Sequence, residues 1–124
     1  MTPINKDLSY AVVGASTNPD KYGHKVFKDL LESGFDVVPI NPHAKQILNK
    51  KVFPDLKSSP QKIDVAVMVV PPDIAQKIIS QAADQGINHI WFQPGSESEA
   101  AIQAALDQGM QVTSNACIMV QRQQ

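Results

Sequence analysis

The chain has 124 residues, of which 43% are hydrophobic and 19% charged, and its formal net charge at pH 7 is −1. That length favours one domain spanning residues 1–124, with enough apolar content for a buried core. The near-neutral charge argues against nucleic acid as a partner, and the shortness of apolar runs such as VAVMVV argues against a membrane span. The single cysteine, Cys117, excludes an internal disulfide framework. The N-terminal segment lacks the apolar core of a signal peptide, so a cytoplasmic location is expected.

The first half of the chain alternates between two hydrophobic periods. Residues 10–15, YAVVGA, are a short apolar run with a glycine near the end, which predicts a buried parallel strand. Residues 24–34 have apolar side chains at helical spacing and end at a glycine, which predicts a helix. A second strand is predicted over residues 35–42. Only a brief edge strand is predicted over residues 50–56, because Pro54 cannot donate to a strand ladder.

The second half of the chain continues the alternation. Residues 64–70 are apolar throughout after Asp64, which predicts a strand with both faces covered. Residues 71–86 begin with two prolines and end at a glycine, as expected for a helix. The apolar stripe of this helix is predicted to contain Ile74, Ile78, Ile79 and Ala82. A strand at 89–95, a helix at 96–109 with a capping serine, and a strand at 110–114 complete the series.

Strands that alternate with helices of this length pair in parallel through right-handed crossovers. The predicted fold class is therefore α/β, a Rossmann-like, doubly wound, mainly parallel sheet of about five strands with helices on both faces. Such sheets bind ligands outside the carboxyl ends of their strands. The loops predicted to form the site are 14–23, 41–45, 70–73, 93–97 and 114–117.

The distribution of charge favours an anionic ligand. Residues 1–62 contain nine Lys/Arg and six Asp/Glu, whereas residues 63–124 contain two and six. A basic first half suits an anion bound by the early loops, although lysines that only solvate helix faces would give the same count.

The loop GASTNPDKYG carries the strongest local signal for that anion. Gly14 can leave the strand in a conformation that other residues avoid and lets a phosphate approach the backbone. Ser16 and Thr17 add hydroxyl groups, and Lys21 and Lys25 add charge near the start of the helix. An ordinary strand–helix turn is the alternative interpretation. The loop lacks the ending of a P-loop, so a nucleoside triphosphatase is not expected.

The segment PINPHAK follows the second strand, where an NAD-binding domain usually has an acid for the ribose 2′-hydroxyl. This chain has Asn41 there, followed by His43 and Lys45. A neutral amide next to bases tolerates a phosphorylated ribose, which favours NADP or coenzyme A over NAD. A simple Asn-Pro turn is the alternative.

Two later loops add candidate contacts but no catalytic group. Val70, Pro71 and Pro72 can form a rigid apolar ledge for a flat ring, or merely begin a helix. Gln93 and Gly95 place amides at the mouth of the fourth strand. The three histidines are scattered, and no nucleophile elbow or metal-ligand spacing is present. The sequence therefore predicts a binding site with no catalytic residue and no metal.

Four segments in order carry a family resemblance: AVVGAS at 11–16, GFDVVPINP at 34–42, DVAVMVVPP at 64–72 and WFQPG at 91–95. Together they resemble the small stand-alone CoA-binding proteins of bacteria and archaea. That family is similar to the N-terminal CoA-binding domain of the succinyl-CoA synthetase alpha subunit. The resemblance runs from residue 9 to residue 120.

The resemblance implies a role for individual positions. The loop at 14–23 would bind the CoA phosphates, and the loop at 41–45 would contact the nucleotide part. The loops at 70–73 and 93–97 would lie on either side of the cofactor. The implied cofactor-binding residues are Gly14, Ala15, Ser16, Thr17, Asn18, Lys21, Asn41, Pro42, Lys45, Val70, Pro71, Pro72, Phe92, Gln93, Pro94 and Gly95. Small members of the family tend to carry arginine just before the cysteine. This chain has Ala116 there, so that contact is not expected.

The resemblance also implies what the chain does. In the synthetase, the phosphohistidine belongs to a second domain and the nucleotide site to a partner subunit, so acyl-CoA synthesis by this chain alone is not expected. The expected function is binding of coenzyme A or an acyl-CoA by a non-catalytic or regulatory module, with a protein partner or a homo-oligomer left open. An NADP-type oxidoreductase or redox sensor, and a protein-interaction subunit with a vestigial pocket, are the alternatives.

Overall fold

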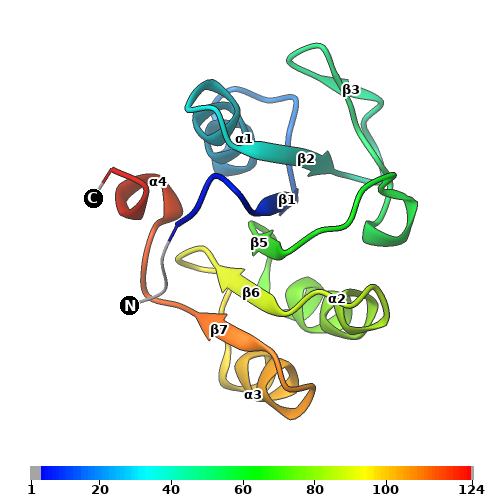
Figure 1. The fold of residues 1–124 in the computed structure, drawn as a ribbon, viewed down its shortest axis with the longest axis vertical. Helices are drawn as coiled ribbons and strands as arrows, with labels where there is room; N and C mark the ends of the chain where they lie inside the picture. Colours follow the sequence, from blue (N-terminus) through cyan, green and yellow to red (C-terminus); the bar gives the residue numbers. More distant parts are fainter. Residues whose placement is uncertain (1–3, 124) are drawn as a thin grey trace.

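Five short apolar segments form the central sheet in this computed structural model, which describes residues 4–123 (Figure 1). Their order across the sheet is β2-β1-β5-β6-β7, and every neighbouring pair is parallel. The strands are β1 (Ser9–Val13), β2 (Asp36–Ile40), β5 (Val65–Met68), β6 (His89–Phe92) and β7 (Gln111–Thr113). The predicted α/β Rossmann-like class is confirmed.

Helices cover both faces of this sheet, as Figure 1 shows. They are α1 (Tyr22–Glu32) and α4 (Ile118–Gln121) on one face, and α2 (Pro72–Asp84) and α3 (Glu99–Asp107) on the other. Side chains of β1 alternate accordingly, because successive residues of a strand point to opposite faces. Tyr10 and Val12 pack with α1, whereas Ala11 and Val13 pack with α2. No helix in the described part of the chain is long and apolar enough to cross a membrane.

The ends of two helices follow from their sequence. Pro72 begins α2, where its missing N–H is not needed for a helical hydrogen bond. Ser98 caps α3, since its hydroxyl accepts a hydrogen bond from the Ala101 N–H at 3.0 Å. The proline at the start of α2 and the capping serine of α3 are confirmed, although α3 begins at Glu99 and not at the predicted residue 96.

The connection between β2 and β5 differs from the prediction. Instead of an edge strand over 50–56, it contains β3 (Gln46–Ile47), β4 (Lys50–Lys51) and the 3₁₀ helix η1 (Leu56–Ser58). The strands β3 and β4 form a separate two-residue antiparallel ribbon. Phe53 meets the main sheet through one bridge to Ile40. Pro54 follows immediately, so the ladder goes no further.

The buried stripe of α2 is also displaced from the predicted one. Ile79 and Ala82 are buried as expected, but Ala75 takes the third position, and Ile74 is 40% exposed. Ala75, Ile79 and Ala82 have the spacing of one helix face, so Ile74 and Ile78 lie at the edge of that face. This shift leaves apolar side chains available to a cavity described below.

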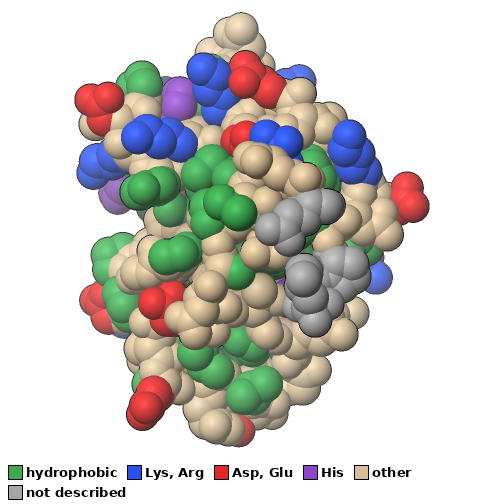
Figure 2. All heavy atoms as spheres, turned by 90° about the vertical axis from the view of Figure 1, so that its left-hand side faces the viewer, with side chains coloured by type: hydrophobic (Ala, Val, Ile, Leu, Met, Phe, Trp, Pro, Cys, Tyr) green, Lys and Arg blue, Asp and Glu red, His purple; other side chains and the backbone are tan. Residues whose placement is uncertain are grey.

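Basic side chains gather toward one end of the molecule. Lys and Arg side chains lie in the upper part of Figure 2, at the end that carries α1, and the lower part shows few of them. The excess of basic residues in the first half of the sequence is therefore located at the end of the molecule that carries α1.

Burial of His89 makes stability depend on pH. The side chain is 6% exposed, and its Nε2 lies 2.8 Å from the Thr113 hydroxyl. Desolvation lowers the pKa of His89 below its usual 6.5. Below about pH 6.5 the unfolded chain binds a proton that the folded chain resists, so the stabilisation present at higher pH is lost as the pH falls.

We therefore expect the free energy of unfolding, measured by urea denaturation, to decrease as the pH falls below about 6.5. His89→Gln should reduce this slope, whereas the same change at exposed His43 should leave it intact. Equal slopes in both variants would contradict the role of burial.

Candidate functional site

The loops after β1 and β5 diverge at the carboxyl edge of the sheet. From β1 the chain passes outward to β2, and from β5 it passes to β6 in the opposite direction, which makes this edge the topological switch point. Gly14 and Val70, which follow these two strands, line the same two cavities there. The site predicted from the loop positions therefore coincides with a real concavity.

Three cavities lie along this edge. The α2 cavity, of about 340 Å³, is walled by Pro42, Pro54, Ile74, Ile78 and Gln81. The loop cavity, of about 520 Å³, is walled by Ser16, Asp20, Lys21, Gly23 and Pro71. The Cys117 cavity, of about 310 Å³, is walled by Gln93, Pro94 and Cys117. Gly14, Asn41 and Val70 belong to both of the first two, and Tyr22 and Val69 to both of the last two, so the three are adjacent, and together they are called the cleft.

Three main-chain segments pack closely beside this cleft. Gly14 has φ +96°, and a Cβ atom on it would overlap the carbonyl oxygen of Val69. A Cβ atom on Gly23, the second residue of α1, would overlap the carbonyl oxygen of Gly14. The two glycines thus bring three backbone segments into contact, which a side chain at either position would prevent.

Unpaired hydrogen-bond donors face the loop cavity. Within residues 4–123, no acceptor meets the main-chain N–H groups of Ser16, Tyr22 and Gly23. His24 Nδ1 donates to the Ser16 carbonyl oxygen at 2.9 Å and so holds that end of the loop. Lys21 lies at the N-terminus of α1 and lines the cavity, as does the exposed Asp20. Free N–H groups at a helix start favour an anion.

The α2 cavity has no basic residue in its lining. Asp55 is its one acidic lining residue, and no Lys, Arg or His belongs to the lining. Hydrogen bonds from the hydroxyl and N–H of Ser58, at 2.6 and 2.9 Å, lower the pKa of Asp55. Its carboxylate is therefore ionised at neutral pH. This cavity suits an apolar ring with hydroxyl or amine donors better than it suits a phosphate.

Asn41 joins two of the predicted loops. Its Nδ2 donates to the Ala15 carbonyl oxygen at 2.7 Å, and its Oδ1 accepts from the His43 N–H at 2.7 Å. The residue thus forms the turn that the sequence allowed as an alternative, and it also lines two cavities. An acid here would lack the donor that meets Ala15.

The Cys117 segment is held in place by Trp91 of β6 and by Gln93, the residue that follows this strand. Gln93 is 3% exposed; its Oε1 accepts from the Ile118 N–H at 2.8 Å, and its Nε2 donates to Cys117 Sγ at 3.4 Å. Trp91 donates to the Ala116 carbonyl oxygen at 3.0 Å. The sequence placed the Gln93 amide at the mouth of the strand, and the structure shows both of its polar atoms already engaged.

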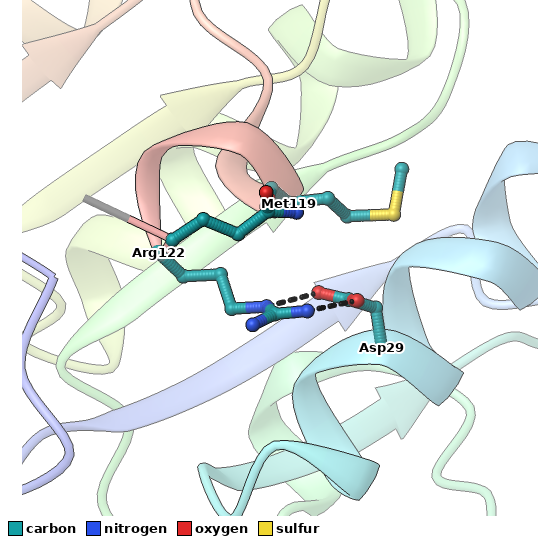
Figure 3. Close-up of polar contacts among 4 residues, drawn as sticks. Asp29, Met119 and Arg122 are labelled. Atoms are coloured by element: carbon teal, nitrogen blue, oxygen red, sulfur yellow. Dashed lines mark hydrogen bonds and ion pairs between the residues drawn. The ribbon is translucent and has the colours of Figure 1, made fainter.

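A bidentate ion pair fixes α4 on α1 (Figure 3). Arg122 donates from Nε and Nη2 to the two carboxylate oxygens of Asp29, at 2.8 and 2.7 Å. The planar guanidinium matches the carboxylate, so the pair fixes orientation as well as distance. The helix that begins just after Cys117 is thereby tied to the helix that begins at the loop cavity.

The predicted site residues fall into three groups. Nine line the cleft: Gly14, Ser16, Lys21, Asn41, Pro42, Val70, Pro71, Gln93 and Pro94. Thr17, Asn18, Lys45 and Gly95 are exposed on neighbouring loops outside these linings, and Pro72 begins α2. Ala15 and Phe92 are fully buried in the core, so their side chains do not reach the cleft.

Several lining residues were not predicted. Tyr22 is 65% exposed and lies between two cavities, and Ile74, Ile78 and Gln81 form the α2 wall. The sequence predicted Ile74 on the apolar stripe of its helix. In the structure it lies at the margin of that stripe, which brings it into the cavity lining. In the described part of the chain, no group of three or more His, Cys, Asp or Glu could hold a metal ion.

The strand order and the helices on both faces define a Rossmann-like α/β domain with a cleft at its switch point. The chain belongs to the CoA-binding domain family, whose family model matches residues 8–123. The resemblance found in the four sequence segments is therefore confirmed.

Known relatives include both large and small proteins. The chain is 34% identical over 91 residues to ADP-forming acetate–CoA ligase II of Archaeoglobus fulgidus, covering 68% of this chain and 14% of the ligase. It is 28% identical over 117 residues to the uncharacterized protein YneT of Bacillus subtilis, covering 94% of this chain and 87% of YneT. A conserved hypothetical protein of Pyrococcus furiosus has a solved structure with 40% identity and a TM-score of 0.87, covering 91% of this chain and 97% of that one. The chain thus spans about a seventh of the ligase.

Proposed function

We propose that the chain binds coenzyme A, or a thioester of it, along the cleft and acts as a binding or regulatory module without catalysis of its own. The observation that carries the proposal is the order of the cavities. The loop cavity, with free N–H groups, Lys21 and Asp20, lies in the middle. On one side is the α2 cavity, whose lining is mostly apolar with one acid, and on the other is the Cys117 cavity, whose lining has no charged residue. Coenzyme A has the matching order, with phosphates between an adenosine and an uncharged arm.

The diphosphate would lie in the loop cavity. The N–H groups of Ser16, Tyr22 and Gly23 would donate to phosphate oxygens in this cavity. A helix start favours a negative charge by about 0.3–1 kcal/mol when exposed, and by more when partly buried. Lys21 would add a charge-assisted contact.

The adenosine would lie in the α2 cavity. Pro42 and Pro54 on one side and Ile74 and Ile78 on the other form rigid or branched walls suited to a flat ring. Asp55 offers acceptor oxygens to a ribose hydroxyl or an exocyclic amine.

Binding without catalysis is supported by the surroundings of the thiol in the cleft. Cys117 has the Gln93 amide as its hydrogen-bond partner, whereas an activated cysteine has a base or a cation beside it. If such a module serves acyl-CoA synthesis, other domains or a protein partner would supply the chemistry. The cytoplasmic location stays a prediction.

A ligand panel tests the proposal. We expect coenzyme A to raise the unfolding temperature of the purified protein more than dephospho-CoA, NADP or ATP at equal concentration. At a hundred times its dissociation constant, coenzyme A should add about 2.7 kcal/mol of stability. An equal or larger effect of NADP would favour the oxidoreductase alternative, and no effect of any of the four would favour an interaction subunit.

Lys21→Ala should weaken coenzyme A binding, with Lys62→Ala as a control because Lys62 is exposed and lies outside the cleft linings. Loss of affinity for coenzyme A but not for dephospho-CoA would assign Lys21 to the extra phosphate. Equal loss for both would assign it to the diphosphate. Unchanged affinity for both would remove Lys21 from the proposed site.

A further inference from the structure

We propose that the Cys117 cavity holds the thioester end of the ligand and selects short, uncharged acyl groups over acyl groups that carry a carboxylate. This inference rests on the proposed function and adds to it the class of thioester. It follows from the position, the lining and the size of this cavity.

Position assigns the cavity to the sulfur end of the ligand. The loop cavity shares Tyr22 and Val69 with the Cys117 cavity, and Gly14 and Val70 with the α2 cavity. A ligand whose phosphates occupy the middle therefore extends one end into each outer cavity. The α2 cavity, with its apolar walls and one acid, takes the base, which leaves the uncharged arm and its thioester for the Cys117 cavity.

The lining of the Cys117 cavity lacks a group that would compensate a carboxylate. Its residues are Tyr22, Val69, Gln93, Pro94 and Cys117, none of which carries a positive charge. The Gln93 amide is a neutral group whose Oε1 is an acceptor and whose Nε2 already uses one of its two N–H groups on Cys117. A carboxylate that moves from water into such a lining loses hydration without gaining a charged partner.

The charged groups around this lining do not change that conclusion. In the loop that follows Pro94, Glu97 accepts from the Gly95 N–H through Oε1, at 3.3 Å, and its Oε2 is buried without a partner. A second carboxylate near this loop would add repulsion. Lys25 lies over the Tyr22 ring, 5.4 Å from its centroid, but it is exposed, where water and salt screen its charge.

Size limits the acyl chain. The cavity volume of about 310 Å³ is at the lower end of the roughly 300–1,000 Å³ typical of ligand pockets. Part of that space must hold the end of the uncharged arm, so a few acyl carbons fill the remainder. Long acyl chains would extend into solvent and gain little affinity.

The test depends on butyryl-CoA and succinyl-CoA, whose acyl groups have the same number of carbons and differ in charge. Dissociation constants for coenzyme A, acetyl-CoA, butyryl-CoA and succinyl-CoA would be measured by calorimetry with the full chain. We expect acetyl- and butyryl-CoA to bind within about threefold of coenzyme A, and succinyl-CoA to bind at least about tenfold more weakly than butyryl-CoA. Equal affinities for butyryl- and succinyl-CoA would overturn this inference alone. Failure of all four to bind would overturn the proposed function itself.

A charge introduced at Tyr22 tests the location. Tyr22→Lys adds a cation to the lining at a largely exposed position, so the fold should tolerate it. We expect it to bring the affinity for succinyl-CoA to within about threefold of that for butyryl-CoA. Leu106→Lys, at an exposed position of α3 outside the three linings, is the charge-matched control and should leave the ratio unchanged. An unchanged ratio in Tyr22→Lys, or an equal change in the control, would overturn the placement.

Discussion

Gly14→Ala is expected to lower the free energy of unfolding by about 2–5 kcal/mol, a large part of the stability of a domain this size. The residue has φ +96°, which costs a residue with a Cβ about 1–2 kcal/mol. The added methyl group would also overlap the Val69 carbonyl oxygen, a backbone atom that can move only with its strand. Overpacking of this kind costs about 1–3 kcal/mol more.

Gly86→Ala separates these two causes. Gly86 also has a positive φ, +72°, but no atom lies within 4 Å of the position that its Cβ would take. We expect this variant to lose only the conformational contribution of about 1–2 kcal/mol. Urea denaturation of both variants gives the comparison. If both lost the same stability, the contact between the Gly14 and Val69 backbones would not contribute.

Asn41→Asp is expected to weaken coenzyme A binding by at least about tenfold, which corresponds to about 1.4 kcal/mol. Asn41 Nδ2 donates to the Ala15 carbonyl oxygen, and a carboxylate would place a second acceptor against that oxygen. The residue also lines both the α2 and the loop cavities, so the new charge would repel the phosphates from close range. Both effects act in the same direction.

Asn49→Asp is the matched control. Asn49 is exposed in the turn between β3 and β4 and does not belong to the linings of the three cavities. Calorimetric titration should show its affinity close to that of the unmodified chain. Retention of full affinity in Asn41→Asp would mean that phosphates bind elsewhere.

The main strands and helices were predictable because their hydrophobic periods are regular. The run at Val65–Met68 is apolar on both faces, and the sheet buries both of those faces. The position of the cleft was predictable for a topological reason, since parallel strands carry their ligand loops at one edge. These inferences need only the spacing of residue types along the chain.

Short elements and side-chain directions could not be predicted in the same way. Four residues, Ile118–Gln121, are too few to show a helical period, and α4 depends on contacts with distant residues such as Gln93 and Asp29. For Asn41 the sequence placed an amide at the right edge but could not tell that the amide already meets Ala15 and His43. Tertiary hydrogen bonds of this kind leave no local pattern.

The backbone contact at Gly14 has a consequence for altering the protein. The backbone segments that meet at Gly14 and Gly23 are held together without side chains of their own, so exchanging the side chains around the cleft leaves this packing intact. Ile74 and Gln81 at one end, and Tyr22 at the other, project from separate helices and can be exchanged independently. Substitutions at either end of the cleft could therefore adapt the same scaffold to a different ligand without any change to the two glycines.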